Sequence, residues 1–311
     1  INSNLILIWV SVLSHFAIAR LIRQKLLIPL QSAITAMGAP GLYSGFVKKA
    51  NDLLSKDFLS EQKFSVSSTT IGGLTLTSAL SKKGGLSFGD VAACYNYNNT
   101  LVDVKVDTNS QISTTLTFPN IIPSAKTIAS FKLTDKDSGK LEVQYFHHHA
   151  ALSSAVSLTQ SPAIDVSASF GTPSFAFGLD AGYNTKSGNL VKYSAGISLQ
   201  KPDSCSAVIL GDKGDTIKAS YVQHLDKGKR STLVAEVSRR FSTNENTVTV
   251  GGSYRVDHLT TVKAKMNNNG VVNAVLQHEV IPKSLLTVSC ELDTKAFDRA
   301  PRFGCALSLK Y

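Results

Sequence analysis

The feature that most constrains this chain is an alternation of apolar and polar residues that runs from about residue 63 to residue 311. Residues 101–107 show it best, because Val102, Val104 and Val106 alternate with two aspartates and a lysine. Successive side chains on a β-strand point to opposite sides of the sheet. Each such segment therefore predicts a strand with one apolar and one polar face.

The length of this pattern predicts a membrane barrel. It continues to the end of the chain without a helical interruption, and no apolar run is long enough for a clear membrane-spanning helix. A barrel with lipid outside and water inside needs strands of this two-faced kind. Charged residues make up only 17% of the chain, below the roughly 25% of soluble domains. A soluble β protein, whose outer face would be wet and highly charged, is the alternative that the pattern leaves open.

We expect an all-β transmembrane barrel of nineteen strands over residues 61–311, most of them about 8–11 residues long, which suits tilted membrane strands. The intervening turns are short and rich in Gly, Asn, Asp and Ser, so consecutive strands should be antiparallel neighbours. The strands are expected to begin near Glu61, Leu74, Leu86, Leu101, Ile112, Ala125, Lys140, Ala151, Ala163, Ser174, Leu190, Ser204, Asp215, Ser231, Asn246, Leu259, Val271, Ser284 and Arg302.

Residues 37–60 predict an amphipathic α-helix and a linker. Within them, residues 43–56 place apolar side chains at three- and four-residue steps, with polar residues and lysines opposite. At about 1.5 Å per residue this helix would be roughly 21 Å long, too short to span a bilayer. It could pack against the barrel wall or lie on the membrane surface, and an ordinary amphipathic core helix is the plainest interpretation.

Residues 1–36 differ in kind from the rest. Their apolar stretch is interrupted by a histidine and three basic residues, whereas a secretory signal carries its positive charge before the apolar run. The first methionine is Met37, and the Gly-Ala-Pro-Gly-Leu-Tyr that follows looks like a natural start. We expect residues 1–36 to be a translated leader or non-native extension; a membrane anchor or targeting segment is the alternative.

The net charge of +10 indicates a surface or lumen that attracts anions. Nucleic acid is another common partner of a basic chain. The sequence carries no zinc-ligand spacing, helix-turn-helix pattern or basic-aromatic RNA motif, so we expect no nucleic acid as the primary ligand.

No constellation in the sequence predicts catalysis, a cofactor or a metal. The four cysteines are scattered without a Cys-x-x-Cys pair, and we interpret them as small apolar residues. Residues 147–149 are consecutive histidines, but neighbours on a strand alternate faces, so a hairpin end fits better than a metal site. There is no Ser-His-Asp set and no phosphate loop. We therefore expect a protein that is not an enzyme.

Three segments carry a family resemblance. Residues 40–58 read PGLYSGFVKKANDLLSKDF, and residues 254–274 read YRVDHLTTVKAKMNNNGVVNA. The third segment is the C-terminal set Arg302, Gly304, Leu307 and Leu309. In order, these resemble the N-terminal helix, the diagnostic late-strand motif and the barrel-insertion signal of the mitochondrial voltage-dependent anion channel, the eukaryotic porin family, and most closely its plant members. His258 departs from the late-strand motif, where a small residue or proline is usual.

The resemblance implies a nineteen-stranded barrel whose first and last strands pair in parallel, since an odd number cannot close antiparallel throughout. It implies a helix inside the pore and passage of ATP, ADP and other metabolic anions across the mitochondrial outer membrane. It further implies a voltage-gated, weakly anion-selective channel that closes partly at high voltage of either sign.

Two departures from the family bear on individual residues. The family's glycine-rich hinge after the helix is missing, since residues 56–60 read KDFLS. Of a Gly-Leu-Lys element linked to nucleotide contact, only Lys126 carries over. The lysines expected to line the pore and contact anions or nucleotides are Lys48, Lys49, Lys56, Lys126, Lys263 and Lys265. Taken singly, each could equally be a solvated charge with no special role.

Other functions stay open at this level. A protein-import barrel of the same superfamily would be expected to carry a longer N-terminal extension. A docking platform for hexokinase or other cytosolic proteins could coexist with the channel, as could a homo-oligomer in the lipid bilayer. A soluble β protein would purify without detergent.

Overall fold

The computed structural model describes residues 40–98, 100–119, 123–296 and 300–311. The chain divides into two compact units, Ile1–Gly38 and Ala39–Tyr311, and the fold below is that of the second. The leader expected over residues 1–36 lies outside the described residues. Among the described residues, no helix is both long and apolar enough to cross a membrane.

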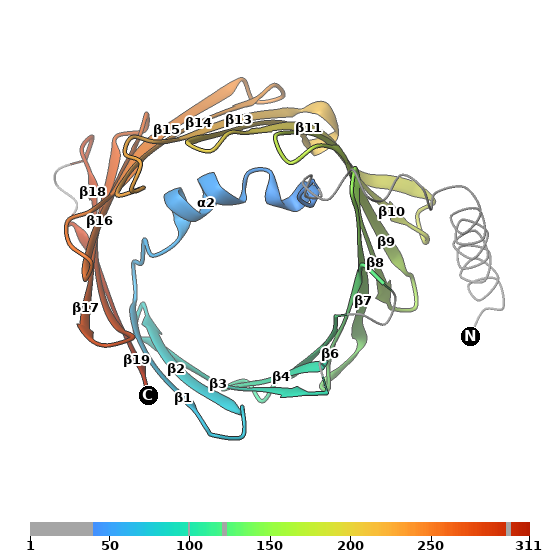
Figure 1. Cartoon of the computed structure of the whole chain (residues 1–311), viewed down its shortest axis with the longest axis horizontal. Helices are drawn as coiled ribbons and strands as arrows, with labels where there is room; N and C mark the ends of the chain where they lie inside the picture. Colours follow the sequence, from blue (N-terminus) through green and yellow to red (C-terminus); the bar gives the residue numbers. More distant parts are fainter. Residues whose placement is uncertain (1–39, 99, 120–122, 297–299) are drawn as a thin grey trace, which may run out of the picture. The chain divides into compact units, whose positions relative to one another are not determined.

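The described chain forms one closed sheet of nineteen strands, as expected. Figure 1 shows the strands surrounding a central space, with the first strand beside the last. The strands are β1 (Gln62–Thr69), β2 (Thr75–Lys83), β3 (Leu86–Tyr97), β4 (Thr100–Asp107), β5 (Ile112–Phe118), β6 (Ala125–Lys132), β7 (Asp135–His147), β8 (Ala150–Leu158), β9 (Ala163–Gly171), β10 (Phe175–Asn184), β11 (Asn189–Gln200), β12 (Ser204–Gly211), β13 (Thr216–His224), β14 (Ser231–Arg240), β15 (Glu245–Arg255), β16 (Thr260–Asn267), β17 (Val271–Ile281), β18 (Ser284–Asp293) and β19 (Arg302–Lys310).

One parallel pair closes the barrel. β1 pairs β19 in parallel, with a register that runs from Gln62 opposite Cys305 to Ser67 opposite Lys310. β1 also pairs β2 antiparallel, and the remaining consecutive strands pair antiparallel through short turns. With an odd number of strands, alternation of direction must fail once around the ring, and it fails at this seam.

The outer face of the barrel is apolar. Phe177, Leu199 and Val250 point away from the lumen and are 39–49% exposed, like many other large apolar side chains of the same parity. A continuous apolar outer surface is stable against hydrocarbon and would be unstable in water. This face excludes the soluble β protein that the alternation left open.

The chain before β1 lies inside the barrel (Figure 1). It consists of the short 3-10 helix η2 (Tyr43–Gly45) and the α-helix α2 (Lys48–Ser55), which contacts β13, β14 and β15. The α-helix therefore begins later than the predicted residue 43. Gly45 weakens a continuous helix, and the rings of Tyr43 and Phe46 turn to the wall as a separate cluster. The expected position of the helix inside the pore is confirmed.

Two small apolar clusters attach this segment to the wall. Tyr43 and Phe46 pack on Ala176 of β10 and Ala207 of β12. Ala50 and Leu54 of α2 pack with two wall residues, Val222 and Val234. The apolar stripe of the helix is thus buried against the wall, and its polar side faces the lumen.

Candidate functional site

Glycines on the inner wall let the N-terminal segment approach the strands closely. A Cβ atom at Gly178 would lie 2.5 Å from Cδ2 of Tyr43, and one at Gly196 would lie 3.2 Å from Cε2 of the same ring. A Cβ atom at Gly251 would lie 3.0 Å from Cδ2 of Leu54. A larger side chain at these places would hold the helix off the wall, so the three glycines form a seat for it.

Tyr43 anchors the start of the segment. Its hydroxyl donates to Ser194 Oγ over 2.8 Å, and Ser194 in turn donates to Asp180 over 3.5 Å. Lys192 forms an ion pair with the same aspartate. Burial raises the pKa of the Tyr43 phenol, a shift that the hydrogen bond with Ser194 opposes. The phenol therefore stays a neutral donor in the physiological range.

Polar contacts continue along α2. Lys218 of β13 donates to Asn51 Oδ1 over 3.1 Å and pairs with Glu236 of β14 at 3.0 Å. Lys49 reaches Cys205 Sγ at 3.3 Å. One wall lysine is thus shared between the helix and a wall carboxylate, which fixes the rotation of α2 about its axis.

The linker after α2 is held at several points. Asp57, which has a positive φ of 76°, pairs with Lys263 at 2.6 Å, and the two side chains are only 23% and 13% exposed. Lys265 donates to the Leu54 carbonyl over 2.6 Å and lies 4.3 Å from the centre of the Phe58 ring. The absent hinge glycines are therefore replaced by side chains that attach the linker to β16.

A further contact ends the linker just before β1. Ser289 of β18 donates its hydroxyl to the Leu59 carbonyl. The same carbonyl lies directly over Gly304 of β19, where any Cβ atom would collide with it. Gly304 therefore has a packing role that its place in the C-terminal motif did not reveal.

The predicted site residues fall into three groups. Lys48 and Lys49 of α2, and Lys56 directly after it, are exposed inside the barrel, and Lys49 also contacts Cys205 of the wall. Lys126 is half-buried on β6, in a part of the wall away from the helix (Figure 1). Lys263 contacts the linker and Lys265 contacts the end of α2, as described above. Contact of any of these lysines with anions or nucleotides stays a prediction.

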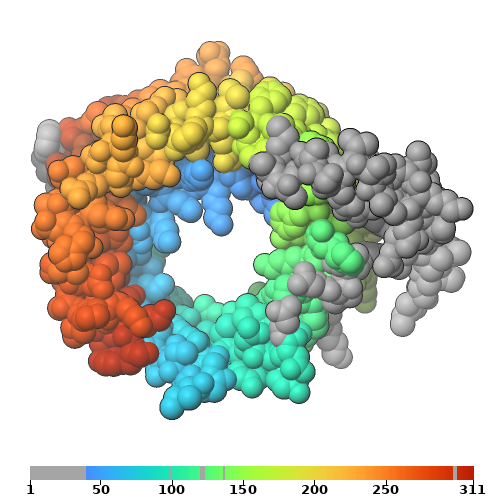
Figure 2. All heavy atoms as spheres, viewed as in Figure 1, coloured from blue at the N-terminus to red at the C-terminus, as the bar shows by residue number. Residues whose placement is uncertain are grey.

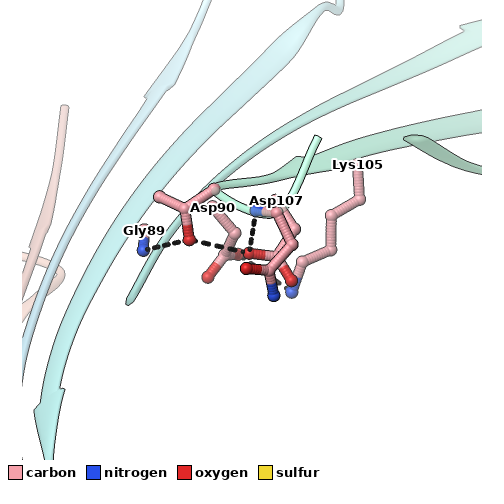
Figure 3. Close-up of polar contacts among 6 residues, drawn as sticks. Gly89, Asp90, Lys105 and Asp107 are labelled. Atoms are coloured by element: carbon pink, nitrogen blue, oxygen red, sulfur yellow. Dashed lines mark hydrogen bonds and ion pairs between the residues drawn. The ribbon is translucent and has the colours of Figure 1, made fainter. Parts of the chain in front are cut away.

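The wall away from the helix carries charges that pair with one another (Figure 3). Lys105 of β4 pairs with Asp90 of β3 at 2.9 Å. At the nearby end of β4, Thr108 donates to Asp107 over 3.0 Å and accepts the backbone N–H of Gly89 over 3.4 Å. Paired charges of this kind contribute little net field to the lumen.

Sequence reasoning missed the residues that hold the helix. Asp57, Asp180 and Lys192 were not among the candidates, although their charges in an apolar chain are a signal. Their partners lie more than a hundred residues away or across a strand pair. Only the register of the barrel brings them together.

Figure 2 shows that side chains leave an opening through the middle of the barrel, beside the helix. A closed sheet with an apolar outer face and a polar, open interior is a transmembrane β-barrel pore.

The comparisons agree with this class. The family model described as eukaryotic porin matches residues 39–304, and the chain belongs to that family. Over 271 residues the chain is 56% identical to mitochondrial outer membrane protein porin 2 of Arabidopsis thaliana, covering 87% of this chain and 98% of the relative. It is 54% identical over 275 residues to mitochondrial outer membrane protein porin 5 of Oryza sativa subsp. japonica, covering 88% and 99%. The expected location in the mitochondrial outer membrane is thereby confirmed.

Among solved structures, a mutant of the Rh. blastica porin aligns with a TM-score of 0.43 and 10% identity, over 66% of this chain and 86% of that chain. A likeness at this level supports no conclusion about this chain.

Proposed function

We propose that this chain is a voltage-gated, weakly anion-selective pore that passes ATP, ADP and other small metabolites and ions across the mitochondrial outer membrane. One observation carries the proposal. Lys48 and Lys49 of α2 and the adjoining Lys56 are exposed inside the barrel, and among the described residues none of them has an ion-pair partner.

A pore of this kind needs a water-filled lumen and an electrostatic field that attracts anions. It does not need a site that binds them tightly. Unpaired positive side chains raise the local concentration of anions and lower the barrier to their passage. The three helix lysines outnumber Asp52, the one exposed carboxylate on α2. Lys126 adds positive charge from the other wall, while Lys263 and Lys265 add less because they also hold the helix and linker.

The attachment of the helix supports voltage gating. A charge moved through the whole membrane potential gains about 2.3 kcal/mol per 100 mV. A hydrogen bond such as that of Tyr43 or Asn51 contributes on the order of 1 kcal/mol. The energy gained from the membrane potential and the energy of such a hydrogen bond are of similar size. A voltage of this size can therefore shift the equilibrium between the attached helix and a displaced one.

The test of selectivity is the reversal potential of the pore in a planar bilayer under a potassium chloride gradient. We expect the triple variant K48Q/K49Q/K56Q to lose much of its anion preference, because three positive charges without ion-pair partners are removed from the lumen. The matched control K186Q/K213Q/K283Q removes the same charge from exposed turns. The assignment is contradicted if both triple variants shift the reversal potential equally.

The C-terminal strand is proposed to carry the insertion signal in Arg302, Gly304, Leu307 and Leu309. In support, Leu307 and Leu309 share the outward parity of Phe303, which is 66% exposed. The variant L307D/L309D should fail to insert into isolated mitochondria, whereas A306D, on the lumen parity, should insert normally.

Partners beyond the bilayer and the permeants stay predictions. We expect cytosolic proteins such as hexokinase, and further copies of the chain, to be recovered with it from a detergent extract. We expect no catalytic activity and no cofactor.

A further inference from the structure

A hollow of about 310 Å³ lies at one mouth of the barrel, lined by Arg230, Arg255, Val256, Asp257 and His258. Arg230 ends the turn between β13 and β14, Arg255 is the last residue of β15, and the other three residues follow it in the turn to β16. The volume falls at the lower end of small-molecule sites, which run from about 300 to 1,000 Å³. None of these residues was a candidate from the sequence.

The two arginines lie directly opposite each other. The backbone N–H of Arg255 donates to the Arg230 carbonyl over 2.9 Å, one step beyond the pair formed by Ser231 and Tyr254. Like charges at directly opposite positions on antiparallel strands are destabilising. Among the described residues, neither guanidinium has a hydrogen-bond or ion-pair partner. An anion between them would remove the repulsion and satisfy both.

Both arginines belong to the lumen side of the wall. Arg255 pairs with Thr261, which shares its face with Lys263, and Lys263 contacts the linker inside the barrel. Tyr254, on the other face, is 55% exposed with the apolar outer surface. A solute approaching the lumen can therefore reach the guanidinium groups from the aqueous side.

The charge around the hollow favours an anion. The two arginines outnumber Asp257, the one carboxylate in the lining. The turn that leads to Arg230 adds Lys227 and Lys229 and one further carboxylate. Two guanidinium forks in the lining of one hollow suit the oxygens of a phosphate group, to which each can donate two hydrogen bonds.

We propose that this hollow binds the phosphate groups of a free solute, at the mouth of the pore and before the solute reaches α2. The proposal rests on the pore function given above and adds to it a site formed by residues of the wall rather than of the helix. It commits to a solute rather than a lipid headgroup because both arginines share the lumen parity.

The test is calorimetric titration of inorganic pyrophosphate into the refolded full chain in detergent micelles at low salt. R230Q/R255Q should bind at least about tenfold more weakly, because two charged donors are lost. The matched control R240Q removes an arginine of the same lumen parity at the other end of β14 and should bind as the parent does. Equal binding by R230Q/R255Q and the parent, or an equal loss in R240Q, would overturn the proposal.

A second variant separates the planar shape of the guanidinium group from its positive charge. It also tests whether weaker binding comes from misfolding. R230K/R255K keeps both charges but loses the planar fork, so it should bind at least about threefold more weakly than the parent. Binding equal to that of the parent would overturn recognition by the forks. Far-UV circular dichroism verifies that each variant keeps its strands.

The lipid source is tested by repeating the titration in nanodiscs of neutral phospholipid with and without an anionic phospholipid. We expect the same pyrophosphate affinity in both. Competition by the anionic lipid would assign the hollow to a headgroup instead and overturn the proposal. Because these titrations measure binding and no current, their failure is separate from a failure of conduction in planar bilayers.

Discussion

At the scale of single residues, three glycines on the inner wall decide where the helix can lie. Gly178 and Gly196 admit the ring of Tyr43, and Gly251 admits Leu54. Alternation predicts that these glycines lie on a strand, but the reason for a glycine at each place becomes visible only when the helix is in position. The sequence alone therefore predicts the strands of the wall, but it does not predict the glycine seat on which the helix lies.

The seat gives a prediction for Gly178→Ala. The added methyl group would overlap the Tyr43 and Phe46 rings, so the helix should detach more often, at a cost of about 1–3 kcal/mol. Hydrogen exchange of the α2 amides should become about fivefold faster or more. In the control Gly211→Ala the new Cβ has only one neighbour, at 4.0 Å, and exchange should not change. Unchanged exchange in both variants would show that the close approach does not hold the helix.

At the scale of elements, the linker between α2 and β1 is the segment that the family's sequence pattern describes least well. The missing hinge glycines put its flexibility in doubt, and the structure shows contacts of Asp57, Phe58 and Leu59 with the wall. The sequence could not reveal them because Asp57 and Lys263 are 206 residues apart. Their meeting depends on the closure of the whole barrel.

The linker predicts a change in gating for Asp57→Asn. Loss of the Lys263 ion pair, worth on the order of 1 kcal/mol, should lower the half-closing voltage by roughly 20–40 mV if one or two charges move. Voltage ramps in a planar bilayer measure it.

The control is Asp52→Asn, which removes the same charge from an exposed position on α2. It should raise anion preference without lowering the half-closing voltage. An equal fall in both variants would mean that charge alone, and not the ion pair, sets the voltage.

At the scale of the whole molecule, alternation was enough to predict most of the fold. Strands such as β4 have the predicted alternation, and the count of nineteen is confirmed. The parallel seam between β1 and β19 came from the family resemblance, because local patterns carry no information on which distant strands pair. The hollow at the mouth was missed for the same reason, since its two arginines come from separate hairpins.

The spread of charge over the lumen predicts how selectivity depends on salt. Screening shortens the reach of a charge from about 10 Å at 0.1 M to about 3 Å at 1 M. Anion preference should therefore fall steadily as the mean salt concentration rises at a fixed gradient ratio. A preference that does not change with salt would point to a narrow binding site instead of a field.

The most direct test of the central claim is a recording of the refolded chain in a planar bilayer under a salt gradient and a voltage ramp. The account predicts a large pore that prefers anions when open and drops to a smaller, less anion-selective state at both polarities. A cation-preferring pore that responds to presequence peptides would contradict it in favour of protein import. An absence of conductance from well-folded protein would contradict the pore itself.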